Sequence, residues 1–275
     1  SWVGTLNGLF KFDGLSWKKT TLNDSKLPSN KMLCIEFIND IIYIGTDEGL
    51  VVINNNEWRV YNTGNSKLPS NKIKQIKKGA QGALWIATSK GLVKHTKGFE
   101  TILSQELRGI KNDNFITLAI DEENKKWIGT NTGLYSFKKG VWRIYTTKNS
   151  LLPDNHIWSI VIDNENKVWI GTKKGIASYA DLNNEWNLYN KKNTPLKTNI
   201  IKSLSFDDYD RLWVGTQKGV FTFDGDEWVK HKIGRYKKEI YNIFIDVNDN
   251  KWISTKQALY IYNQEGVEFK YNKNR

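Results

Sequence analysis

The chain has few of the residues that build disulfides, metal sites and nucleophilic active sites. Its one cysteine, Cys34, can form neither an intramolecular disulfide nor a cysteine-based zinc site. Histidine occurs three times, at positions 95, 156 and 231. No apolar run approaches the roughly 20 residues of a membrane helix. The sequence therefore predicts no metal, no cofactor and no direct membrane span. No signal peptide is visible, and a start at Ser1 rather than Met is compatible with its removal by processing or trimming.

Acidic residues are also in the minority, with 29 Asp and Glu against 41 Lys and Arg, for a net charge of +12. Such a balance suits nucleic acid, an anionic glycan or a membrane surface. The lysines stand singly along the whole chain, and no basic run carries interleaved stacking aromatics. Nucleic acid is therefore not expected as a partner.

Aromatic residues are abundant at 13% of the 275 residues, and they include 12 tryptophans. Hydrophobic residues make up 39% and charged residues 25%, which is typical of a soluble globular protein. A core of considerable size can be filled by these rings. The hydrophobic content is also too high for an intrinsically disordered chain.

Most of the tryptophans belong to a motif that recurs seven times. Trp127-Ile128-Gly129-Thr130, followed by Gly133-Leu134, is a typical copy. The copies begin at residues 2, 43, 85, 127, 169, 213 and 252, and a second aromatic follows each by 14 to 17 residues. Eleven tryptophans occupy one of these two positions, and only Trp158 does not. A period near 42 residues indicates a repeat architecture.

One repeat reads as four short strands joined by polar turns. Runs of β-branched and aromatic residues cover 157–162, 168–172, 176–179 and 186–189. We expect Gly175 to adopt a positive φ, and Gly171 to admit an aromatic ring from the next sheet. Four strands in each of seven repeats predict an all-β fold, a seven-bladed β-propeller of four-stranded antiparallel blades. It would occupy residues 1–275 as a single domain. The chain starts on a motif, so the first strand of blade one is missing.

The motif Trp-Ile-Gly-Thr-x-x-Gly-Leu, with Asp-rich turns before it and Leu-Pro-x-Asn after it, resembles the two-component regulator propeller repeat. The resemblance covers the whole chain. It implies a seven-bladed propeller that serves as an extracytoplasmic sensor module of bacterial hybrid histidine kinases, often one that responds to polysaccharide fragments. It also implies a location in the periplasm or at the cell surface, with a lipid anchor upstream of Ser1 as one arrangement.

A ligand or partner site is expected where the loops lead into the first strands, which is an analogy at the level of the fold. All four prolines lie in these loops, which suits rigid loops. Trp158 and Tyr241 would offer stacking surfaces at the channel mouth, and Lys74, Lys202 and His156 would donate hydrogen bonds. The last two candidates, Arg235 and Lys237, lie in the loop before the first strand of blade seven.

Two function classes remain open, and an enzyme is not expected. Asp121, Asp163, Asp207 and Asp246 recur at one turn of successive blades, so we expect them to bind turn N–H groups rather than to catalyse. The first class is a cell-envelope interaction scaffold, or a subunit of a surface protein complex. The second is a sensor-type module that binds an oligosaccharide or another small ligand. The partner would be another envelope protein or a glycan.

Overall fold

The computed structural model describes residues 1–102, 114–233, 239–263 and 266–272. These residues form seven antiparallel sheets, numbered one to seven in chain order. Within the described ranges the helical structure is a single 3₁₀ turn, Ala80–Gly82. Sheets two to seven have four strands, and sheet one, which lacks a counterpart of their first strands, has three. The seven-bladed all-β propeller predicted from the repeats is confirmed.

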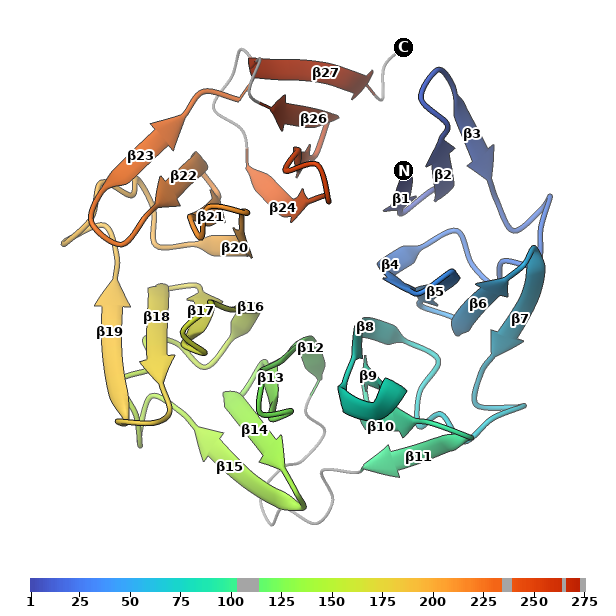
Figure 1. Cartoon of the computed structure of the whole chain (residues 1–275), viewed down its shortest axis with the longest axis horizontal. Helices are drawn as coiled ribbons and strands as arrows, with labels where there is room; N and C mark the ends of the chain where they lie inside the picture. The colour runs from blue at the N-terminus through green and yellow to red at the C-terminus, as the bar shows by residue number, and fades with distance from the viewer. Residues whose placement is uncertain (103–113, 234–238, 264–265, 273–275) are drawn as a thin grey trace. The chain divides into compact units, whose positions relative to one another are not determined.

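The chain divides into two compact units, and unit 1 comprises Ser1–Asn131 and Ser136–Trp142. It holds sheets one to three and much of sheet four (Figure 1). The strands of these four sheets are β1 (Trp2–Thr5), β2 (Gly8–Phe12), β3 (Trp17–Thr20), β4 (Met32–Ile38), β5 (Ile41–Thr46), β6 (Leu50–Asn54), β7 (Glu57–Tyr61), β8 (Ile73–Lys78), β9 (Leu84–Thr88), β10 (Gly91–His95), β11 (Phe99–Ile102), β12 (Phe115–Ile120), β13 (Lys126–Thr130), β14 (Leu134–Lys138) and β15 (Val141–Tyr145).

Unit 2 comprises Thr132–Tyr135 and Arg143–Arg275, and it holds sheets five to seven. Their strands are β16 (Ile157–Ile162), β17 (Val168–Thr172), β18 (Gly175–Ala180), β19 (Glu185–Tyr189), β20 (Ile201–Phe206), β21 (Leu212–Thr216), β22 (Gly219–Phe223), β23 (Trp228–His231), β24 (Ile240–Ile245), β25 (Lys251–Thr255), β26 (Ala258–Asn263) and β27 (Gly266–Asn272). In every sheet the strands follow one another in chain order.

The turn between the second and third strands is closed by threonine and glycine. Thr172 Oγ1 donates to the Gly175 carbonyl at 2.8 Å and accepts the Lys174 N–H at 3.1 Å. Gly175 has a φ of 127°, and a Cβ there would lie 2.5 Å from the Tyr189 carbonyl oxygen. Any other residue would be strained at this position. The positive φ expected at Gly175 is confirmed.

The glycine inside the second strand receives an aliphatic side chain rather than an aromatic one, so the sequence expectation was wrong on this point. A Cβ on Gly171 would lie 2.9 Å from Ile201 Cγ2, and one on Gly215 would lie 2.8 Å from Ile240 Cγ2. Each isoleucine begins the first strand of the next sheet. The missing side chain therefore brings neighbouring sheets together at the start of their first strands.

The repeated aspartate holds its own turn and the anchor tryptophan together. Asp163 Oδ1 accepts the Lys167 N–H at 2.8 Å, and Oδ2 accepts the Trp169 indole N–H at 2.7 Å. Trp169 packs against the apolar residues of sheet six, among them Leu204 and Phe223. The same pair of bonds recurs at Asp121, Asp207 and Asp246. The expectation that these aspartates bind turn N–H groups is confirmed.

Three of the loops that lead from one sheet into the next share an asparagine cap. Asn65 accepts the Asn62 N–H at 2.8 Å and donates its amide to the Val60 carbonyl, on the outer strand β7, at 2.9 Å. Asn149 and Asn193 make the same two bonds at their loops. A buried leucine next to the proline fixes each of the four proline-containing loops to the core: Leu27, Leu68, Leu152 and Leu196.

Replacing Trp169 by alanine should lower the free energy of unfolding by about 3–5 kcal/mol, as for other buried large aromatics. The ring is 6% exposed and contacts sheet six, so its removal leaves a cavity. Urea denaturation measures the loss. Leu182→Ala, at a fully exposed side chain, is the control. A loss below 1 kcal/mol would show that the ring is not part of the core.

Asp207→Asn should destabilise the protein in a pH-dependent way. Burial by itself would raise the pKa of Asp207, but hydrogen bonds from Trp213 and Arg211 outweigh it and lower the pKa. The carboxylate therefore stabilises the fold above its unfolded pKa near 3.8, and this stabilisation is lost as the pH falls through the lower folded value. We expect a loss of about 1–3 kcal/mol at pH 7.

Urea denaturation of Asp207→Asn at pH 7, 4 and 3 checks this sign. The difference from the unmodified chain should shrink towards pH 3. The exposed neighbour Asp208, changed to Asn, serves as the matched control. A difference that stays constant across the three pH values would contradict the assigned role.

Candidate functional site

Every first strand of sheets two to seven carries a one-residue bulge near its start. In sheet five the pairing passes from Ile157–Thr172 to Ser159–Gly171, which leaves Trp158 without an opposite residue. The corresponding bulge residues are Leu33, Lys74, Ile116, Lys202 and Tyr241. A bulge redirects a side chain and is common beside functional sites. The backbone thus provides the same position in six sheets, and the side chain there differs in nearly every one.

In unit 2 two of these bulge residues are in contact. The strands β16, β20 and β24 lie side by side (Figure 1). Lys202 Nζ lies 4.0 Å from the centroid of the half-buried Trp158 ring, which is a close cation–π contact. Lys173, from the turn between β17 and β18, places its Nζ 5.7 Å from the same centroid. We call Trp158, Lys173, Lys202 and His156 the Trp158 cluster.

His156 completes the cluster as a neutral group. Its ring meets the Trp158 ring at an interplanar angle of 77° with a centroid separation of 5.4 Å. Burial first, and then the positive charges of Lys173 and Lys202, lower the pKa of His156, although Asp154 opposes them. At neutral pH the imidazole is therefore uncharged and able both to donate and to accept a hydrogen bond.

The charges around the cluster are only partly balanced. Lys202 pairs with Glu239 at 3.6 Å, and Lys174 pairs with Asp154 at 3.7 Å. Within the described ranges no carboxylate lies at ion-pair distance from Lys173. The cluster therefore keeps one exposed cation beside an aromatic ring, which is an arrangement suited to an anionic group attached to an apolar surface.

The other predicted site residues are more dispersed. Tyr241 is 45% exposed on β24 in unit 2. Lys74 lies on β8 in unit 1, where burial, and after it the charge of Lys72, lowers its pKa. Arg235 and Lys237 lie outside the described residues. Lys173 and Glu239 were not among the predicted site residues. The signal for Lys173 was available, because it stands in the turn of the repeat that carries Trp158.

The remaining candidates for catalysis are engaged in packing. The His231 ring stacks on Trp213 with a centroid separation of 4.7 Å, and the centroids of the His95 and Phe99 rings are 4.4 Å apart. Burial raises the pKa of the Cys34 thiol to about 12, so it stays protonated at neutral pH. Across the described ranges no group of three or more His, Cys, Asp or Glu residues is placed to hold a metal ion. Nor does any helix there have the length and apolarity to cross a membrane.

A family profile described as two component regulator propeller matches residues 151–174. The matched segment is similar to a two-component regulator propeller repeat. It includes the loop into β16, Trp158 and the motif of sheet five. The Trp158 cluster thus has three of its four members, His156, Trp158 and Lys173, within this matched repeat. A search of curated proteins gave no match.

Solved structures share the fold of this repeat protein. The extracellular domain assigned to the hybrid two component system BT3049 of B. thetaiotaomicron has a TM-score of 0.75 and 24% identity over 88% of this chain. This chain spans only 34% of that one. A catalytically inactive histidine-to-alanine variant of Staphylococcus aureus virginiamycin B lyase, with quinupristin, is also similar. Its TM-score is 0.72 and its identity 12%, over 86% of this chain and 83% of the lyase.

A third similar structure is YCF48 from Cyanidioschyzon merolae, with a TM-score of 0.70 and 15% identity over 92% of this chain and 88% of that one. The three proteins have unrelated descriptions, and one of them is an enzyme. Their common feature is the propeller fold, which by itself does not decide between sensing and catalysis.

Trp158→Ala should cost far less stability than Trp169→Ala, about 1 kcal/mol or less, because Trp158 is half-buried and its main partners are lysines. Urea denaturation of the two variants side by side checks this. Equal losses would show that Trp158 is a core residue of sheet five, and the cluster could then not be a binding surface.

Proposed function

We propose that this chain is a non-catalytic, sensor-type propeller that works outside the cytoplasm and binds an acidic oligosaccharide at the Trp158 cluster. The single observation that carries the proposal is the cation–π contact of Lys202 with Trp158, beside the cation of Lys173, which has no ion-pair partner among the described residues. Trp158 is the one tryptophan that the repeat does not require, and it stands at a bulge. The resemblance of the repeat to two-component regulator propellers supports a sensing role.

The placement of the two lysines favours an acidic sugar over a neutral one. A bare tryptophan face would suit any sugar ring, but Lys202 already lies 4.0 Å from the Trp158 centroid. A carboxylate or sulfate on the ligand would pair with Lys173 without breaking an existing ion pair. Its sugar ring would contact the exposed part of Trp158, and neutral His156 would exchange hydrogen bonds with hydroxyl groups.

Catalysis is not part of this proposal. Cleavage or elimination needs a convergent acid, base or nucleophile, and the cluster contains one neutral histidine with two lysines. His156 donates its backbone N–H to Asp154 at 2.8 Å, and within the described ranges no carboxylate accepts a hydrogen bond from its ring. We therefore expect the bound sugar to be released unchanged.

Calorimetric titration with tri-galacturonate, a sulfated disaccharide and maltotriose tests the proposal. The acidic sugars should bind and maltotriose should not. Trp158→Ala and Lys173→Gln should each weaken binding by about 1–3 kcal/mol, the range for loss of an interface anchor. Lys218→Gln, in the equivalent turn of sheet six, is the control. Equal affinity for acidic and neutral sugars, or no binding at all, would refute the proposal.

A further inference from the structure

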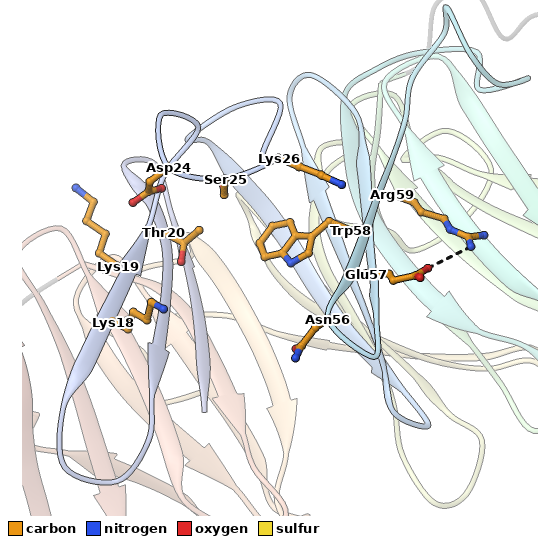
Figure 2. Close-up of a pocket in the computed structure, with 10 residues that line it drawn as sticks. All are labelled: Lys18, Lys19, Thr20, Asp24, Ser25, Lys26, Asn56, Glu57, Trp58 and Arg59. Atoms are coloured by element: carbon orange, nitrogen blue, oxygen red, sulfur yellow. Dashed lines mark hydrogen bonds and ion pairs between the residues drawn. The ribbon is translucent and has the colours of Figure 1, made fainter.

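A groove of about 810 Å³ opens in unit 1 between the outer strands β3 and β7. Figure 2 shows the Trp58 ring extending from β7 towards the strand that carries Lys18, Lys19 and Thr20. The Glu57–Arg59 pair projects to the other side of β7. The groove is separate from the Trp158 cluster, and it has the volume of a ligand site.

The groove carries an excess of positive charge. Lys18, Lys19 and Lys26 line it and are exposed. None of these three has a carboxylate at ion-pair distance in the part of the chain that the structure describes. The two acids of the groove are already engaged, because Glu57 pairs with Arg59 at 3.4 Å and Asp24 accepts the Thr21 N–H at 2.5 Å. The groove therefore attracts an anion.

The edge of β3 differs from those of β7, β15 and β19 in one residue of the loop that follows it. Asn65, Asn149 and Asn193 each donate an amide N–H to the carbonyl five residues earlier, which lies on an outer strand. The equivalent residue of the first loop is Asp24, and the equivalent carbonyl is that of Lys19. Asp24 keeps the bond to the Thr21 N–H, and this bond lowers the pKa of Asp24, so it is ionised and has no proton to donate.

The carbonyl of Lys19 therefore lacks the cap that the structure shows at three other edges. The pairing of Phe10 with Lys19 corresponds to that of Val51 with Val60, whose carbonyl points outward to Asn65. An outward carbonyl on an uncapped edge strand is an acceptor for the N–H of an added strand. A glycan would use the lysines but would have no reason to prefer this backbone edge.

We propose that the β3–β7 groove binds an extended acidic peptide segment of a partner protein, which adds as a strand to the β3 edge. A backbone N–H of the peptide donates to the Lys19 carbonyl. Side chains at alternate positions of the peptide face the groove, where acidic ones meet Lys18 and Lys26 and an apolar one packs on Trp58. This surface makes the chain able to dock a second protein independently of any ligand at the Trp158 cluster.

The test uses the fluorescent-labelled peptide Ac-Glu-Ser-Val-Ser-Glu-Ser-Glu-amide, whose acidic and apolar side chains share one face of a strand, and anisotropy at low salt. A copy with alternate N-methylated backbone, unable to pair as a strand, and a tri-galacturonate competitor complete the set. The decisive variant is Asp24→Asn, which restores the amide cap. By charge alone it would strengthen binding of an acidic peptide, whereas capping of the edge should weaken it by about tenfold.

We expect the plain peptide to bind, the N-methylated copy to fail, and Asp24→Asn and the double variant Lys18→Gln, Lys26→Gln both to weaken binding. Lys191→Gln, at an exposed lysine of unit 2, should leave it unchanged. Stronger binding to Asp24→Asn, or equal binding of the N-methylated copy, would mean that the lysines only attract charge and would overturn the proposal. Binding of tri-galacturonate in place of the peptide, or no binding by the peptide at millimolar concentration, would also overturn it.

Discussion

The hydrogen bond between the anchor tryptophan and the turn aspartate is the contact on which the packing of sheets four to seven depends. In sheet five, Asp163 fixes the turn between the first and second strands and holds the Trp169 indole N–H at 2.7 Å. The ring is then held among the apolar residues of sheet six, where it fills the core. A buried indole N–H without an acceptor would be costly, so the aspartate and the tryptophan are required together.

The repeated contacts leave one position open to variation. The strand glycine admits the isoleucine of the next first strand, as with Gly171 and Ile201, and this close approach lies next to the bulge. Because the bulge residue is excluded from the ladder, its side chain is not needed for sheet packing. Trp158, Lys202 and Tyr241 occupy this position in unit 2, and function can change there without loss of the fold.

The fold was predictable from the sequence, but the site was predictable only in part. The number of sheets, the missing first strand, the turn glycine and the aspartate bonds all follow from residues that recur, since repetition reveals what the architecture needs. The side chain that packs on Gly171 was not predictable. A glycine repeated within the second strand shows that a neighbouring side chain comes close, but not which side chain it is. Trp158 stood out as the exception to the repeat. Lys173 could be placed in the turn of the same repeat, but its contact with Trp158 could not be predicted, because a lysine on a tight turn looks like any solvated lysine until its distance to a ring is known. The difference at Asp24 could not be interpreted from the sequence, because the hydrogen bonds that the amides of Asn65, Asn149 and Asn193 donate to outer strands are visible only in the structure.

A double-mutant cycle between Asp163 and Trp169 tests the central claim most directly. Asp163→Asn, Trp169→Phe and the double variant are compared with the unmodified chain by urea denaturation. If the aspartate acts through the indole N–H, the two changes should couple by about 1–2 kcal/mol, since the phenyl ring has no proton to donate. Additive losses, with a coupling near zero, would mean that turn and ring stabilise the sheets independently, and would contradict the dependence of sheet packing on this hydrogen bond.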